Sequence, residues 1–427
     1  MERLPGFRDF YPEPLPTTDV WSTAARQYIF DTWRAVADTY GFQEYDGPPL
    51  EPLELYTNKS GDEIVGQLYT FTDKGDRAVA LRPEMTPTLA RMIAAHQRNY
   101  KKPIKWFAIP QLFRYERQQK GRLREHFQFN ADLIGESAPA ADAELIALLI
   151  DSLRALRLTS DDFVVRLSSR DAWQAFLTSR SFDLAKAYQF FQIIDKLDRV
   201  EPAESEAKLK PLGLALSEIA DFIEAGKPTE ALGAILQNLA ARGLGDFVKI
   251  DYKIIRGLAY YTGTVFEAFD KKGEFRAIAG GGRYDDLVRR TSGGKADLPA
   301  LGFGMGDVVL LELLQQRGVL PMFDPRLDVY CLIEDEALRD QTMSVVQAFR
   351  SAKLSCDYSL VALKPDKQFK RAQESNARLI ARLESPPAGS LALKLKNLAT
   401  REEKLCTLDE AIEIARNTEP GTSNPEL

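Results

Sequence analysis

The strongest constraint on the fold comes from residues 125–134, where apolar and polar side chains alternate along the chain. With a period of two, Phe127 and Phe129 fall on one face of a strand, and Gln128 falls on the other. Residues 104–116 are expected to form a second strand. The connection 117–124 is longer than the roughly two to five residues that a hairpin needs. This stretch therefore predicts an antiparallel hairpin with an apolar core face, a polar second face and a functional loop.

Cationic side chains gather on this hairpin. Counting by twos places Arg114 and Glu116 on one face of the first strand, while Gln128 and Asp132 share the polar face of the second. The loop adds Arg117, Lys120, Arg122 and Arg124. Guanidinium groups bind phosphate oxygens in a bidentate manner, which favours a phosphate-bearing ligand. An ordinary solvent-facing amphipathic hairpin would show the same alternation, so the pattern alone leaves both interpretations open.

A second polar cluster lies in LRPEMTPTLAR, residues 81–91, at an expected junction between a strand and a helix. Thr86 is a suitable N-cap, and Pro87 suits the first helical turn. Glu84 at this junction could accept the ammonium group of a substrate. Its position is also explained by helix capping and by the favourable helix dipole.

A third cluster is formed by RGLAYYTGTVFEAFD (256–270) and AIAGGGRYDDL (277–287). Arg256 is expected to end one strand, and Tyr260 and Tyr261 to begin the next, with a hairpin turn at 270–273. Three consecutive glycines in a strand usually mark a close approach of backbone or ligand. The tyrosines could equally be packing residues.

The element pattern predicts several domains. Helices are expected at 20–40, ended by Gly41, at 140–158 and near 306–317, and the stretch 169–245 has mostly helical spacing. Beyond VLPMFDPR (319–326), strands and helices alternate in a unit of roughly 90 residues. The boundaries that we predict are a catalytic core at 1–168, a helical insertion at 169–247, a return to the core at 248–322, a C-terminal α/β domain at 326–416 and a disordered tail at 417–427.

Composition disfavours several classes of function. The chain has only three cysteines and two histidines, which disfavours a disulfide framework, a CxxC metal site and a histidine-dependent triad. Its net charge of −6 means that contacts with nucleic acid must come from local patches. We expect a cytoplasmic protein without a membrane segment or a secretory signal. No P-loop is found, and GFGMGD (302–307) has Asp307 where the dinucleotide fingerprint needs glycine.

Taken together, these motifs resemble one family. RYERQQKGRLREHFQ looks like motif 2 of the class II aminoacyl-tRNA synthetases, and YGFQEYDGPPLE, with Pro48, looks like motif 1. LRPEMTPTLAR, RGLAYYTG and GGGRYDDLV resemble signatures of the histidyl member, and the resemblance covers residues ~4–416. It implies an α+β fold, with an antiparallel six-stranded sheet flanked by helices, a helical insertion and a C-terminal α/β anticodon-binding domain.

The resemblance also implies a reaction and its partners. Histidine and ATP would give histidyl-adenylate, and the histidyl group would pass to the 3′ end of tRNA(His). Mg²⁺ would accompany ATP, no tightly bound metal is expected, and the protein would be a homodimer through motif 1. By position, Arg114 and Arg256 would be catalytic, and Arg114, Glu116 and Arg122 would bind ATP. Histidine would be bound by Glu84, Thr86, Gln128, Asp132, Tyr260 and Tyr261. Weaker candidates for tRNA contacts are Arg124, Lys364, Lys367, Lys370, Arg371, Lys394 and Lys396, for which a solvated charged face is the alternative.

Two positions depart from the family pattern. Val309 stands where motif 3 usually has arginine, and Ala259 stands where aspartate is usual. Both features also look like a plant-organellar-type branch of the same synthetase. The alternative function is a catalytically silent paralog that acts as the regulatory subunit of ATP phosphoribosyltransferase. A third possibility is a tRNA-sensing binding module.

Overall fold

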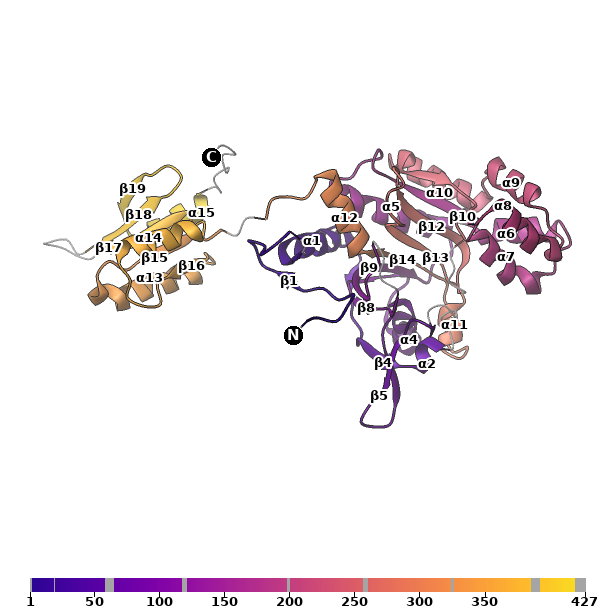
Figure 1. Ribbon diagram of the computed structural model, residues 1–427, viewed down its shortest axis with the longest axis horizontal. Helices are drawn as coiled ribbons and strands as arrows, with labels where there is room; N and C mark the ends of the chain where they lie inside the picture. Colours follow the sequence, from indigo (N-terminus) through magenta and orange to yellow (C-terminus); the bar gives the residue numbers. More distant parts are fainter. Residues whose placement is uncertain are drawn as a thin grey trace. The chain divides into compact units, whose positions relative to one another are not determined.

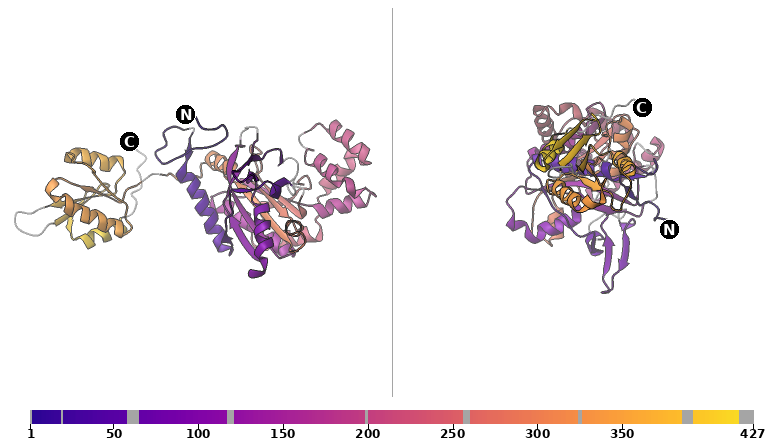
Figure 2. Two further views of the ribbon diagram at one scale, coloured as in Figure 1. Left: turned by 90° about the horizontal axis from the view of Figure 1, so that it is seen from below. Right: turned by 90° about the vertical axis from the view of Figure 1, so that its left-hand side faces the viewer.

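The computed structural model describes residues 2–18, 20–57, 65–116, 121–197, 200–255, 260–323, 326–384 and 392–418 (Figures 1 and 2). The chain divides into two compact units, Met1–Pro321 and Met322–Leu427. None of the helices within the described ranges is both long and apolar enough to cross a bilayer.

The first unit is built on a nine-stranded sheet. In spatial order its main path is β11 (Val248–Ile250), β10 (Phe163–Ser169), β12 (Thr262–Asp270), β13 (Ala279–Arg283), β14 (Ala300–Gly306), β9 (Glu125–Ile134), β7 (Ile104–Ala108) and β3 (Gln43–Glu44), and β8 (Gln111–Phe113) pairs with β9. The six strands from β10 to β7 are antiparallel, as expected from the family resemblance. The outermost strands, β11 and β3, pair in parallel with their neighbours.

Helices cover one face of this sheet (Figure 1). They are α1 (Thr23–Thr39), α5 (Pro139–Ala155), α10 (Glu230–Ala241) and α12 (Asp307–Arg317). Phe129 of β9 is fully buried against this layer, with its ring centroid 5.5 Å from that of Trp33 in α1. Ser22 caps α1 by accepting a hydrogen bond from Ala25, and Gly41 follows the helix at a φ of +73°. The predicted end of this helix is therefore confirmed, because glycine adopts positive φ without strain.

Smaller elements complete the other side of the first unit. A three-stranded sheet contains β4 (Leu50–Pro52), β6 (Ala78–Leu81) and β5 (Tyr69–Thr72), and two short strands, β1 (Phe10–Tyr11) and β2 (Trp21–Ser22), pair near the N-terminus. Helix α4 (Thr86–His96), followed by η1 (Gln97–Asn99), packs against α11 (Leu287–Thr291), and α2 (Glu54–Thr57) lies beside α4. The predicted capping role of Thr86 is wrong, because Met85 occupies the N-cap and Thr86 is already helical. Pro87 does lie in the first turn, as predicted.

The helical stretch between β10 and β11 is also present. It contains α6 (Arg170–Thr178), η2 (Leu184–Lys186), α7 (Ala187–Ile194), α8 (Pro202–Leu209), η3 (Lys210–Leu212), α9 (Leu216–Ala225), α10 and η4 (Gly245–Phe247). Trp173 centres an aromatic cluster with Phe190 and Phe222, at centroid distances of 5.2 and 4.6 Å. Helix α10 packs on α5, which ties the stretch to the helix layer.

The second unit is a separate α/β fold with a five-stranded sheet. Its strands run in the order β16 (Cys356–Tyr358), β15 (Val329–Leu332), β17 (Leu379–Glu384), β18 (Ala392–Asn397) and β19 (Glu403–Cys406). The helices are η5 (Glu336–Leu338), α13 (Arg339–Ser351), α14 (Pro365–Glu374) and α15 (Leu408–Asn417). Strand β19 was not expected. Cys331 and Cys356 are far apart in sequence, yet their Sγ atoms lie 3.6 Å apart on neighbouring strands as free thiols.

Three expected strands differ in their limits. The predicted strand 104–116 is interrupted between β7 and β8, because Pro110 has no N–H to donate to a ladder. The strand expected at 275–280 begins only at Ala279, and Tyr260 and Tyr261 precede β12 rather than open it. The expected turn after Asp270 is confirmed by a hydrogen bond from Gly273 N to Asp270 O of 3.1 Å.

Candidate active site

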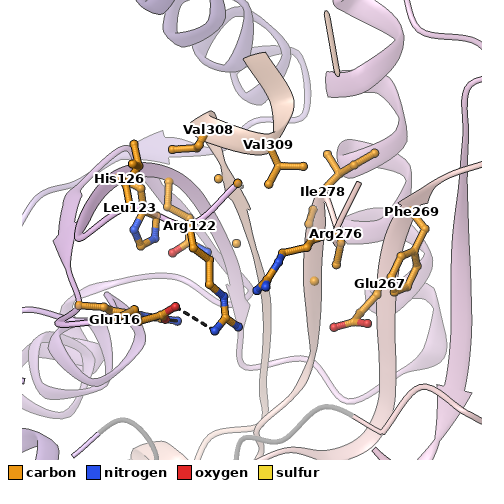
Figure 3. A pocket seen from close by; sticks show the side chains of 18 residues that line it. Glu116, Arg122, Leu123, His126, Glu267, Phe269, Arg276, Ile278, Val308 and Val309 are labelled. Atoms are coloured by element: carbon orange, nitrogen blue, oxygen red, sulfur yellow. Dashed lines mark ion pairs between the residues drawn. The ribbon is translucent and has the colours of Figure 1, made fainter. Parts of the chain in front are cut away.

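A cavity of about 680 Å³ opens on the sheet face opposite to the helix layer (Figure 3). One wall comes from the predicted hairpin, with Arg114, Glu116, Arg122 and Gln128, and the facing wall from β12, β13 and the segment between them. The start of α12 closes one end with Val308 and Val309. We call this site the arginine cavity. It brings together four residues that the sequence analysis placed in one site.

Glu116 links the two arginines of the first wall. Its Oε2 lies 2.9 Å from Nη1 of Arg122, and its Oε1 lies 4.0 Å from Nη1 of Arg114. The side chain of Glu116 is only 9% exposed, whereas that of Arg122 is 44% exposed. Glu116 therefore pairs with the guanidinium group of Arg122 and lies near that of Arg114 at the edge of the cavity.

The polar face of β9 forms the floor of the cavity. Gln128 lines it, and a Cβ atom on Gly304 of β14 would overlap the Gln128 amide. His126 also lines it, and burial together with the cations Arg114 and Arg8 lowers the pKa of His126 to about 3. His126 is therefore neutral near pH 7 and adds no charge to the site.

A group of buried polar side chains lies beside this floor, and we call it the tyrosine cluster: Glu84, Asp132, Tyr260, Tyr261 and Tyr284. The hydroxyl of Tyr284 donates to Oδ1 of Asp132 across 2.5 Å, and that of Tyr260 donates to Oε2 of Glu84 across 2.9 Å. The ring of Tyr260 lies 5.1 Å from that of Tyr261 and 6.1 Å from that of Tyr284. The cluster can therefore present carboxylates and phenols to a small polar ring.

Asp132 carries the most perturbed carboxyl of the cluster. Its Oδ2 is buried and has no hydrogen-bond partner among the described residues. Burial raises the pKa of Asp132 to about 7, and the hydrogen bond from Tyr284 opposes this rise. A buried acceptor without a partner is costly, which indicates a place for a ligand donor. Gly302 makes room for this carboxylate, because a Cβ atom there would overlap Asp132 Oδ1.

The arginine cavity and the tyrosine cluster adjoin each other. Gln128 and Asp132 lie on the same face of β9, four residues apart, with Gln128 in the cavity and Asp132 in the cluster. Arg114 donates from Nε to the carbonyl of Pro83, the residue before Glu84, across 3.0 Å. The cavity and the cluster therefore lie next to each other along β9.

Some predicted residues are not described, and others lie outside the arginine cavity. Arg256 and Ala259 fall outside the described residues, as do residues 117–120. Thr86 is half-buried at the start of α4 and does not line the arginine cavity. Arg124 stacks on the ring of Tyr115 at 4.1 Å, and its backbone N–H donates to the carbonyl of Gly6.

The candidate tRNA contacts of the second unit separate into two groups. Lys364, Lys367, Lys370 and Arg371 are exposed on α14 or at its N-cap. Lys394 and Lys396 of β18 instead pair with Glu403 at 2.7 and 3.1 Å. These two lysines lower the pKa of Glu403 to about 2. Within the first group Lys370 lies 3.7 Å from Glu374, so the two groups differ mainly in the greater exposure of the cations on α14.

Several site residues were not predicted. Arg276 and Glu267 line the wall opposite to Arg122, and Tyr284 binds Asp132. Tyr45 has a buried hydroxyl without a hydrogen-bond partner among the described residues. Burial raises the pKa of Tyr45, and the nearby charge of Asp132 raises it further. Alternation does not identify Arg276, because β13 begins only at Ala279 and all of residues 276–280 line the cavity. No local pattern pointed to Tyr45.

The described residues contain no group of three or more histidine, cysteine, aspartate or glutamate side chains that could hold a metal ion. The acidic side chains of the arginine cavity are Glu116 and Glu267, which lie on different walls.

This chain is similar to known proteins along nearly its whole length. A family model described as Histidyl-tRNA synthetase matches residues 21–307, and one described as Anticodon binding domain matches residues 319–418. The Histidine–tRNA ligase of Opitutus terrae is 46% identical over 424 residues, which cover 94% of this chain and 95% of that protein. The chloroplastic/mitochondrial Histidine–tRNA ligase of Arabidopsis thaliana is 37% identical over 391 residues, covering 87% of this chain and 78% of that protein.

Solved structures support the fold. The crystal structure of histidyl-tRNA synthetase from Nostoc sp. superposes with a TM-score of 0.74 at 24% identity, covering 95% of this chain and 98% of that one. A Bacillus halodurans structure described as an ATP phosphoribosyltransferase regulatory subunit/histidyl-tRNA synthetase has a TM-score of 0.68 at 21% identity, covering 89% and 97%. Fold similarity at this identity does not separate the two functions weighed above, whereas the sequence relatives do.

Proposed function

We propose, from the premise that the chain belongs to the histidyl-tRNA synthetase family and is a histidine–tRNA ligase, that the arginine cavity binds ATP and the tyrosine cluster binds histidine. The observation that carries this assignment is the continuity of the two regions along β9. Gln128 belongs to the cavity, and Asp132 belongs to the cluster on the same face. The carboxylate of a bound histidine would then point at the phosphates of ATP.

The chemistry of activation suits this residue set. The nucleophile in the first step is the carboxylate of histidine itself, which attacks the α-phosphate and releases diphosphate. Catalysis therefore needs positioning and stabilisation of charge rather than a protein nucleophile. Arg114 would hold the α-phosphate, Glu116 would lie near the adenine amino group, and Arg122 would reach the outer phosphates. Arg256 is proposed as a fixed cation beside the carboxylate and the α-phosphate.

Histidine selection is assigned to the second region. Glu84, Thr86 and Gln128 would hold the α-amino group of the substrate. Asp132 and Tyr261 would hydrogen-bond the imidazole nitrogens, and Tyr260 would form a wall of the site. The buried Oδ2 of Asp132 supports this role, because an imidazole N–H would supply the donor that it lacks among the described residues. Sites built from buried polar partners can reject analogues without those groups by roughly 10⁴–10⁵.

We propose that Mg²⁺ reaches the site bound to ATP. Carboxylate oxygens suit Mg²⁺, and Glu267 is the carboxylate on the far wall of the cavity that would face such an ion. No step of the assignment depends on this contact.

The second unit is proposed to bind the anticodon of tRNA(His), with the cations of α14 contacting phosphates. We also propose a homodimer through motif 1, where β3 forms an edge of the large sheet. Sedimentation equilibrium should then give twice the chain mass of 48.0 kDa. A cytoplasmic location remains our expectation. Membership of the plant-organellar-type branch is supported by Val309, Ala259 and the similarity to the Arabidopsis thaliana enzyme.

The central experiment is ATP–diphosphate exchange with each of the 20 amino acids. Exchange is expected with histidine alone, and Arg256→Ala is expected to abolish it. Arg289→Ala, which removes an exposed arginine paired with Asp286 on α11, is the matched control and should retain exchange. Absence of histidine-dependent exchange, together with binding of a phosphoribosyltransferase, would instead establish the silent paralog.

A further inference from the structure

The two walls of the arginine cavity each present an arginine. Arg122 comes from the hairpin loop, and Arg276 comes from the segment that joins β12 to β13. Figure 3 shows the two guanidinium groups pointing toward each other across the cavity. Arg122 is also paired with Glu116 at 2.9 Å. Two guanidinium groups on opposite walls of one cavity can contact a polyanionic group placed between them from both sides.

The third side of the cavity, which Val308 and Val309 form, is apolar. Val308 and Val309 begin α12 there, and a Cβ atom on Gly121 would lie 3.2 Å from Cγ2 of Val309. Position 309 therefore faces the loop that carries Arg122, yet it offers only methyl groups. The motif that this segment resembles has an arginine at this position. Any cation for the outer phosphates must come from another element.

The neighbouring arginine is already committed elsewhere in the cavity. Arg114 donates to the carbonyl of Pro83 and lies near Glu116, next to the tyrosine cluster. If histidine occupies that cluster, the α-phosphate lies at Arg114, and the β- and γ-phosphates extend away from it. The other arginines in the described cavity lining are Arg122, which pairs with Glu116, and Arg276.

We propose that Arg276 binds the outer phosphates of ATP from the wall opposite to Arg122, and so replaces the cation that Val309 does not supply. This inference rests on the proposed function. The two guanidinium groups form a clamp that can bind non-bridging oxygens from both sides, as bidentate arginine contacts with phosphate do.

The test is steady-state ATP–diphosphate exchange with the full-length chain. Arg276→Ala is expected to raise KM for ATP by about 10- to 100-fold, the loss typical of a hydrogen-bonded charged contact, with KM for histidine changed by less than about twofold. Arg276→Lys should restore part of the affinity, because lysine keeps the charge but not the fork. AMP has no outer phosphates, so its inhibition constant against ATP should change by less than about twofold.

Lys272→Ala is the matched control. Lys272 is an exposed cation in the same segment that does not line the cavity, so its loss should leave KM for ATP unchanged. An unchanged KM for ATP in Arg276→Ala would overturn the proposal. An equal rise of KM for ATP in Lys272→Ala would overturn the proposal in favour of a general charge effect. An equal rise of the AMP inhibition constant in Arg276→Ala would overturn it by showing that Arg276 contacts another part of the nucleotide.

The two levels of proposal can be separated. If the unmodified chain shows no histidine-dependent exchange, the proposed function itself falls. If the unmodified chain shows normal exchange and the Arg276 variants have the same KM for ATP as the unmodified chain, only the assignment of Arg276 falls. Should Arg276→Ala be inactive, calorimetric titration with ATP in the presence of Mg²⁺ measures the same loss directly, and an unchanged melting temperature shows that the fold is intact.

Discussion

The hydroxyl of Tyr284 donates a hydrogen bond of 2.5 Å to Oδ1 of Asp132, a carboxyl whose side chain is almost fully buried. Asp132 is in β9, and Tyr284 directly follows β13, 152 positions later in the sequence. This bond orients one oxygen of Asp132 and leaves the other for a ligand. Asp132 is therefore proposed to recognise the ligand, and its burial is expected to cost stability when the carboxyl is charged.

The stability of the protein should depend on the charge of Asp132. Its pKa is about 7 in the folded state because of burial, whereas an exposed aspartate in the unfolded chain titrates near 4. Between these values the folded state binds a proton that the unfolded state has released, so the free energy of unfolding falls as pH rises. Between pH 5 and pH 8, the free energy of unfolding measured by urea titration should fall by about 2–3 kcal/mol more in the unmodified chain than in Asp132→Asn. Parallel pH profiles would contradict the burial of a titrating carboxyl.

Tyr284 and Tyr261 should differ in how they affect histidine binding. Tyr284→Phe removes the donor that lowers the pKa of Asp132, so KM for histidine should rise about tenfold. KM for histidine should fall as Asp132 loses its proton, and in this variant the fall should occur at higher pH. Tyr261→Phe should raise KM for histidine without moving that pH dependence, because the donor from Tyr284 is retained. The measurement is KM for histidine from pH 6 to pH 9. A shift with Tyr261→Phe and none with Tyr284→Phe would reverse these roles.

Gly302 provides a steric test of the site. A methyl group at this position would overlap Asp132 Oδ1 and displace it from Tyr284, while the carbonyl of Ala131 at 3.1 Å limits other adjustments. Gly302→Ala should therefore fold but bind histidine at least about tenfold more weakly, with the loss of a charged hydrogen bond. Gly306→Ala, in the same strand, is the control, since its Cβ would meet nothing within 4 Å. Wild-type KM for histidine in Gly302→Ala would show that this contact does not position Asp132.

A buried ion network joins the N-terminal segment to the sheet. Arg8 lies 2.6 Å from Glu125 and 2.8 Å from Asp307, and both partners are almost fully buried. Arg8→Ala would leave two carboxylates unpaired, so we expect a loss of about 3–5 kcal/mol in the free energy of unfolding. Arg3→Ala is the control, because its pair with Asp9 is exposed and should be worth less than about 1 kcal/mol. Chemical denaturation of both variants makes the comparison, and equal effects would exclude the network as a source of stability.

The second unit should matter for tRNA rather than for activation. Changing Lys367, Lys370 and Arg371 together to glutamate should leave histidine-dependent exchange intact but weaken charging of tRNA(His), because these exposed cations would repel phosphates. The charging defect should grow as salt is lowered, since the introduced repulsion is then less screened. Deletion of residues from 326 onward should likewise spare exchange more than charging. Equal loss of exchange and charging in a folded variant would contradict an anticodon role.

Local patterns predicted the hairpin face well. The alternation in β9 placed Phe129 in the core and Gln128 and Asp132 on the other face, because a period of two is visible within one strand. The glycines of β13 were rightly expected to mark a close approach, since a Cβ atom on Gly281 would overlap the carbonyl of Gly302. Both features depend on residues that are neighbours in sequence or on the smallest side chain.

Features that depend on register were not predicted. Tyr284 meets Asp132, and Arg276 faces Arg122, only because particular strands pair in one alignment, which a single sequence does not reveal. The cap at Thr86 was wrong because helix α4 begins one residue earlier in backbone geometry than its composition indicates. Strand β19 was missed because its exposed residues show no apolar alternation.

The division of β9 into two faces also separates two kinds of evolutionary change. Its aromatic side can drift with compensating exchanges in α1, as hydrophobic cores commonly do when volume is conserved. On its polar side Gln128 and Asp132 have less freedom, because each occupies space left by a glycine of β14. If the proposed site is correct, stability and substrate choice can be engineered on the same ten residues through alternate positions of β9.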